Sequence, residues 1–78
     1  MTNTTLLKEQ IKKSGYKMSF LADMLGIDPS TLSRKINGKA EFWEGEMNIL
    51  SKLLKMNARE KNAIFFANRV DLKSTKKV

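Results

Sequence analysis

The sequence predicts an all-α protein, a compact bundle of about five short helices. Apolar residues recur at helical spacing in several short segments, and each segment is bounded by residues that start or stop a helix. No segment alternates apolar and polar residues as a strand would, and the chain contains no internal repeat. We therefore expect residues 1–70 to form one domain, followed by a basic flexible tail over residues 71–78.

The composition narrows the classes of function. The 78 residues include no cysteine and no histidine, which excludes disulfides, thiolate metal sites and the commonest general base. The eight carboxylates are scattered along the chain, so we expect no enzyme, no metal site and no cofactor. No apolar run approaches the roughly 18 residues of a membrane span, and no secretory signal pattern opens the chain. We expect a cytoplasmic protein with no membrane partner.

The charge favours a polyanionic partner. The net charge is +7, which suits nucleic acid, although a small protein can also be basic for solubility alone. Residues 41–46, EFWEGE, are the exception because they carry three negative charges. We expect this acidic patch to be solvated and to face away from the polyanion.

The functional prediction depends on residues 18–38, whose sequence predicts two short helices joined by a tight turn. Helical spacing places four apolar side chains on one face of the first helix: Phe20, Leu21, Met24 and Leu25. Ala22 falls on the same side and is small enough to let a crossing helix come close. Gly26 stops this helix because glycine adopts the left-handed backbone without a Cβ clash.

The second helix of this pair has clear ends and an unusual outer face. Asp28 is its predicted N-cap, with Pro29 at the first helical position, and Asn37-Gly38 ends it. Leu32 and Ile36 bind it to the first helix. The outer face carries only short hydroxyls and cations: Ser30, Thr31, Ser33, Arg34 and Lys35. A solvated helix without a task would carry better helix formers, so this face favours reading the edges of bases in DNA.

The pair resembles the helix-turn-helix of phage Cro and repressor proteins and their bacterial, XRE-like relatives. The residues that carry the resemblance are Ala22, Gly26, Leu32 and Asn37-Gly38-Lys39, and it extends through Phe42 to Ile64-Phe65-Phe66. It implies a lambda-repressor-like fold whose second helix enters the major groove of double-stranded DNA. It also implies a homodimer on a palindromic operator, and repression by occluding a promoter in a bacterial host cell.

The sequence departs from this family at three places. Lys17-Met18 stands where the family usually has Thr-Gln, at the start of the first helix. Lys35 occupies a position that is usually apolar, and we expect Ile36 to take over its role in the core. Pro29 occupies the first position of the recognition helix, where it can press on a thymine methyl but cannot donate a hydrogen bond.

Five residues are candidates for base contacts: Pro29, Ser30, Thr31, Ser33 and Arg34. Arg34 is the strongest candidate because its guanidinium can donate two hydrogen bonds to the edge of a guanine. Ser30 and Thr31 are equally well explained as capping residues of the first turn, and Ser33 can meet either a base or a phosphate.

Seven residues are candidates for contacts to the DNA backbone: Lys8, Lys17, Met18, Ser19, Lys35, Asn37 and Lys39. Lys17 lies just before a helix start whose unpaired N–H groups suit a phosphate, unless Ser19 itself caps a helix that starts late. Met18 replaces the glutamine that often touches a phosphate in the family. Asn37 is equally explained as a helix stop, and Lys8 as part of a solvated face.

Three further helices complete the expected bundle. The first runs from a cap at Thr4 or Thr5 to about Lys13, the fourth from about Glu44 to Lys55, and the fifth from a cap at Asn57 to about Asn68. Tyr16 is expected to fold back onto the core. The fourth helix carries its apolar stripe at Met47, Leu50 and Leu54, widened by Ile49 and Leu53.

Three aromatic residues leave a second function open. Phe65 and Phe66 point about 100° apart on a helix, so we expect one to pack inside and the other to cover a dimer contact or bind a second protein. Both rings within one core is an equal alternative, and Trp43 is either a core corner or an exposed anchor. The alternative function is a small protein-interaction module that acts, antirepressor-like, by binding a repressor protein.

Overall fold

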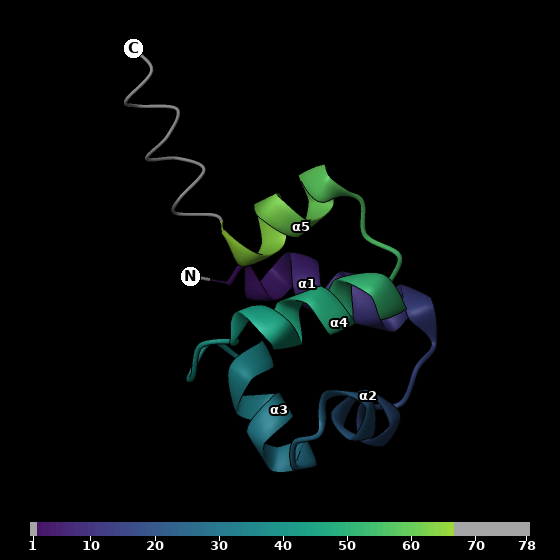
Figure 1. Cartoon of the computed structure of the whole chain (residues 1–78), viewed down its shortest axis with the longest axis vertical. Coiled ribbons are helices and arrows are strands. Elements are labelled where there is room, and N and C mark those ends of the chain that lie inside the picture. The colour runs from purple at the N-terminus through teal and green to yellow at the C-terminus, as the bar shows by residue number, and fades with distance from the viewer. Residues whose placement is uncertain (1, 67–78) are drawn as a thin grey trace.

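The computed structural model describes residues 2–66 (Figure 1), and within that range it confirms the all-α bundle. The five helices are α1 (Thr4–Ser14), α2 (Met18–Leu25), α3 (Pro29–Ile36), α4 (Glu44–Leu53) and α5 (Ala58–Phe65). The predicted tail over residues 71–78 lies outside the described residues. α5 ends at Phe65, with Phe66 already non-helical, so the helix stops short of its predicted end at about Asn68.

The helix ends follow local capping. The start of α2 is confirmed, and the cap of α1 and the end of α4 are corrected. Asn3, and not Thr4 or Thr5, caps α1, because its side-chain oxygen accepts the Leu6 N–H at 3.1 Å. α2 starts at Met18 with Lys17 as its N-cap, so Ser19 lies inside the helix. α4 ends at Leu53, two residues before the predicted end.

The capping box of α5 is confirmed. The Asn57 side chain accepts the Glu60 N–H at 2.8 Å, and the Glu60 carboxylate accepts the Asn57 N–H at 3.0 Å. At the other end of the chain, the Asn3 N–H donates to the Ile64 carbonyl at 2.6 Å. The start of α1 is therefore fixed to the end of α5.

The core lies between the packed helices. α2 packs against α3 and α4, and α1 packs against α3 and α5. The six largest side chains at the centre of the core are at most 2% exposed: Leu7, Leu21, Leu32, Leu50, Ile64 and Phe65. Phe42 adds a ring that meets Phe65 edge-on at a centroid distance of 5.4 Å.

The buried face of α2 differs from the predicted one. Leu21, Ala22 and Leu25 are buried as predicted, but Phe20 and Met24 are 41% and 47% exposed. Met18 packs partly against the core in their place. The helix therefore buries the flank with the smallest side chain, which lets the neighbouring helices approach closely. Tyr16 does not fold onto the core either, since its exposed ring lies 5.0 Å from that of Phe20.

Ile49 is a further correction, on α4. It was predicted to widen the apolar stripe of that helix, but its side chain is exposed. Leu50 and Leu54 are buried as expected, and Met47 and Leu53 pack partly against the core.

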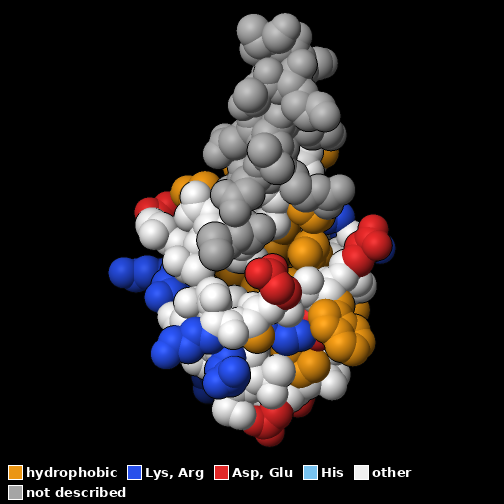
Figure 2. All heavy atoms as spheres, turned by 90° about the vertical axis from the view of Figure 1, so that its left-hand side faces the viewer, with side chains coloured by type: hydrophobic (Ala, Val, Ile, Leu, Met, Phe, Trp, Pro, Cys, Tyr) orange, Lys and Arg blue, Asp and Glu red, His pale blue; other side chains and the backbone are white. Residues whose placement is uncertain are grey.

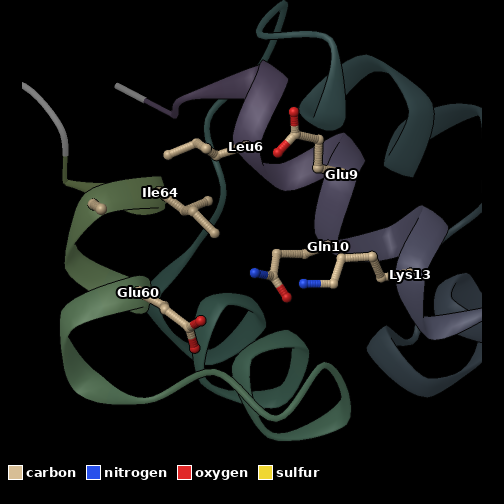
Figure 3. A pocket seen from close by; sticks show the side chains of 7 residues that line it. Leu6, Glu9, Gln10, Lys13, Glu60 and Ile64 are labelled. Carbon is tan, nitrogen blue, oxygen red and sulfur yellow. The ribbon is translucent and has the colours of Figure 1, made fainter.

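A hollow opens between α1 and α5 (Figure 3). It is lined by Leu6, Glu9, Gln10, Lys13, Glu60, Ala63 and Ile64. Its volume of about 210 Å³ lies below the roughly 300–1,000 Å³ of small-molecule sites. Within residues 2–66 no three potential metal-ligand side chains gather, and no helix there is long and apolar enough to cross a bilayer.

Candidate nucleic-acid interface

The turn between α2 and α3 is built on Gly26. Its φ of 72° is left-handed, its N–H donates to the Asp23 carbonyl at 3.1 Å, and the Ile27 N–H donates to the Ala22 carbonyl at 3.0 Å. Three residues, 26–28, separate α2 from α3. Gly26 therefore ends α2, as the sequence predicts.

The start of α3 is capped by Asp28. Its carboxylate accepts the Ser30 hydroxyl and, at 3.1 Å, the Ser30 N–H. These two bonds, with the hydroxyl as the larger cause, hold the pKa of Asp28 below its ordinary value of 3.8. Ser30 is therefore part of the cap in the free protein, and its exposed position still places it at the first turn of α3.

α3 has one buried and one exposed side. Leu32 and Ile36 pack in the core, while Ser30 and Arg34, four residues apart, are exposed. Ser33 and Thr31 are half-buried, and Pro29 is exposed at the first position. Within residues 2–66 the Arg34 guanidinium makes no hydrogen bond or ion pair.

The end of α3 is closed by Asn37. Its side-chain N–H donates to the Ser33 carbonyl at 2.9 Å, and its amide also approaches the Ser33 hydroxyl at 3.4 Å. Gly38 follows with a φ of 81°, and the Lys39 N–H donates to the Arg34 carbonyl at 2.8 Å. The helix-stop reading of Asn37 therefore describes the free protein, and Lys39 emerges exposed just beyond it.

Lys35 is not on the outer face, which corrects the sequence prediction. Its ammonium lies 2.6 Å from the Glu46 carboxylate, and the two residues are only 7% and 9% exposed. Glu46 therefore does not belong to a solvated acidic patch, whereas Glu41 and Glu44 are exposed. Lys35 occupies an inward position between α3 and α4, so an apolar residue or a paired charge is required there.

The remaining backbone candidates are spread over the surface. Lys8, Lys17 and Ser19 are exposed, and Met18 is half-buried against the core. No side chain caps the start of α2, and only from Leu21 onward do its N–H groups donate to helix carbonyls. Figure 2 shows several Lys and Arg side chains close together on one side of the molecule and a hydrophobic patch on the other, with acidic side chains scattered between and around them.

The three aromatic candidates differ in how deeply they are buried. Phe65 is buried and Phe66 packs partly against the core, so both rings contact one core. Trp43 is 75% exposed, so it lies at the surface and is not a core corner.

Comparison with known proteins identifies the family. A family model described as helix-turn-helix matches residues 7–60, which is more than half of the chain and includes α2, the turn and α3. No curated protein and no solved structure matches the sequence. The chain belongs to the helix-turn-helix family of Cro and repressor type, a family of DNA-binding regulators.

Proposed function

We propose that this protein is a sequence-specific transcriptional regulator that lays α3 into the major groove of DNA. The observation that carries the proposal is the division of α3: Leu32 and Ile36 are buried, and Arg34 is exposed beside Ser30 without a partner in residues 2–66. A free guanidinium on a rigid, capped helix suits bidentate recognition of guanine. Thr31, Ser33 and Pro29 are the proposed neighbours of that contact.

Contacts to the DNA backbone are proposed for the residues that flank α2 and α3. The uncapped start of α2 offers free N–H groups to a phosphate, with Lys17 and Ser19 exposed beside it. Lys39 is exposed after the end of α3, and Asn37 and Lys8 are further candidates. Such contacts position the protein and add affinity without reading sequence.

The mode of action that the family resemblance favours is Cro-like repression in a bacterial cell. Two copies would bind a palindromic operator in the cytoplasm and exclude polymerase from a promoter. The small size supports pairing, because a single module of this kind buries only about 600–1,000 Å² of protein surface on DNA.

The test is selection of bound duplexes from a random pool, followed by mobility shifts with Arg34→Ala and Arg34→Lys. Loss of one bidentate contact should weaken binding to the selected duplex by about 1–3 kcal/mol. Arg34→Lys keeps the charge, so its binding to random duplex should match the parent while its preference for the selected duplex falls. Equal binding of parent and Arg34→Ala to both duplexes would show that Arg34 reads no base.

A second function is favoured by the exposure of Trp43. An exposed indole is a common anchor of protein interfaces, and Glu41 and Glu44 beside it are exposed acids. In this alternative the protein binds a repressor protein. Capture of a repressor encoded by the same genome should then survive Arg34→Ala and fail with Trp43→Ala. The opposite pattern, or no capture by the parent, rejects the alternative.

A further inference from the structure

The contact between the end of α3 and the beginning of α4 is made by charged side chains. Lys35 Nζ lies 2.6 Å from Glu46 Oε1, and both side chains are about nine-tenths buried. No buried side-chain nitrogen or oxygen in residues 2–66 lacks a partner. The pair is thus fully satisfied, and it connects residues eleven positions apart in the sequence.

One carboxylate oxygen of Glu46 accepts hydrogen bonds from groups at the ends of two helices. Glu46 Oε1 accepts the Trp43 backbone N–H at 2.8 Å in addition to the Lys35 ammonium. The indole of Trp43 then stands over the ammonium, whose nitrogen lies 5.4 Å from the ring centroid. Glu46 therefore fixes the first turn of α4 and the last turn of α3 at the same time, and Trp43 shields the ion pair.

This cluster is the specific connection between α3 and α4. Figure 1 shows the end of α3 beneath the beginning of α4, whereas the extensive packing of α3 within residues 2–66 is against α1 and α2. Leu32 and Ile36 supply that apolar packing. Apolar contacts tolerate small rotations of a helix, but a buried ion pair requires one distance and one direction.

We propose that the Lys35–Glu46–Trp43 cluster positions the recognition helix, setting the angle at which Arg34 and Ser30 meet the base edges. The inference rests on the proposed function of α3. Arg34 directly precedes Lys35, so any rotation of the last turn moves both side chains together. Buried ion pairs seldom add net stability over an apolar pair of the same volume, which makes orientation a better account of this one than stability.

The test is the double variant Lys35→Met/Glu46→Gln. It removes one charge of each sign, so the net charge of +7 is unchanged, and glutamine keeps an oxygen that can accept the Trp43 N–H. Affinity is measured for the duplex that the parent selects from a random pool and for a random duplex, at a temperature where circular dichroism shows both proteins folded. The ratio of the two affinities should fall by about fivefold or more, the effect of one impaired base contact.

Lys35→Arg is the matched control. It keeps a cation that can pair with Glu46 and stack on Trp43, so its affinity ratio should stay close to that of the parent. Binding to random duplex and its salt dependence should be the same in all three proteins, because Lys35 touches no phosphate in this account. A fall of the salt slope by about one unit in the double variant, with equal losses on both duplexes, would make Lys35 a phosphate contact and overturn the proposal.

A measurement without DNA separates this proposal from the proposed function. In amide ¹H–¹⁵N spectra of the free protein, the double variant should shift the amide signals along α3, from Ser30 to Ile36, whereas Lys35→Arg should shift only the residues next to position 35. Unchanged α3 amides, or an unchanged affinity ratio in the folded double variant, would overturn the positioning role. If the parent selects no duplex at all, the proposed function fails, and the amide spectra alone decide the orientation of α3.

A second variant covers the case in which the first does not fold. Lys35→Leu/Glu46→Leu replaces the pair by apolar side chains, a change that buried ion pairs often tolerate without loss of stability. The same fall in the affinity ratio is expected, and a ratio equal to that of the parent would again reject the proposal.

Discussion

At the scale of single residues, the cations near α3 are not equivalent. Lys39 is exposed beyond the helix end, whereas Lys35 is buried on Glu46. Each phosphate that a protein neutralises steepens the dependence of log affinity on log salt by about 0.9. We therefore predict that Lys39→Met lowers that slope by about 0.9 for selected and random duplexes alike, as measured by fluorescence anisotropy over a series of salt concentrations.

Lys52→Met is the control for this prediction. Lys52 is an exposed cation in the last turn of α4, about 12 Å along the helix axis from its beginning. Its removal should leave the slope unchanged. An equal decrease in both variants would mean that Lys39 contributes only through the net charge of the protein.

The same residues show what the sequence could and could not predict about the site. Helical spacing placed Ser30 and Arg34 on the side of α3 opposite Leu32 and Ile36, and their exposure confirms it. The same spacing does not show which flank of the helix is covered by a distant segment. The burial of Lys35 depends on Glu46, which folding brings within 2.6 Å, and no local pattern reports that approach.

At the scale of helices, capping and stop residues were reliable signals for α2, α3 and α5, whereas the cap of α1 is Asn3 and not Thr4 or Thr5. The N-caps at Asp28 and Asn57 and the stop at Gly26 were predicted because each depends on a local hydrogen bond or a left-handed φ. The buried face of α2 was predicted less well. Leu21, Ala22 and Leu25 are buried as predicted. Two overlapping sets of apolar residues fit one helical period, however, and only the packing of α3 and α4 decides that Met18 is covered while Phe20 and Met24 are not.

The cap of α3 also predicts a dependence on pH. The pKa of Asp28 is lowered in the folded state by its bonds to Ser30. The ionised cap therefore stabilises the fold above the unfolded pKa, and this contribution is lost as the pH falls through the folded pKa. We predict that the parent melts at a higher temperature than Asp28→Asn at neutral pH, and that this difference shrinks as the pH falls below the ordinary value of 3.8.

Thermal melts of both proteins across that range check the prediction. Asp23→Asn controls for the loss of one negative charge, because Asp23 is exposed and is not a capping residue. A melting difference between parent and Asp28→Asn that stays constant down to the lowest pH would mean that the charge of Asp28 contributes nothing to the cap.

At the scale of the whole molecule, the fold was predicted because its parts agree. Caps, glycine stops and apolar spacing all indicate short helices, and residues 2–66 fold as the five expected ones. The pairs of helices that touch, and the ion pair that joins α3 to α4, follow from packing in three dimensions. The number of copies that act together on DNA is likewise a property of the assembly and not of one chain.

The last prediction concerns two copies of the protein bound to one duplex. If each copy lays one α3 into the major groove, two copies related by a two-fold axis reach half-sites about 10 bp apart, on one side of the duplex. Selected duplexes should then contain an inverted repeat and bind two copies, as native mass spectrometry can count. Inserting about 5 bp between the half-sites turns one of them to the opposite side of the duplex, so affinity should fall toward that of a single half-site. A complex of one copy per duplex, with an affinity that the insertion leaves unchanged, would mean that one bundle is the whole binding unit, and Arg34 would then have to supply its specificity without a symmetric partner.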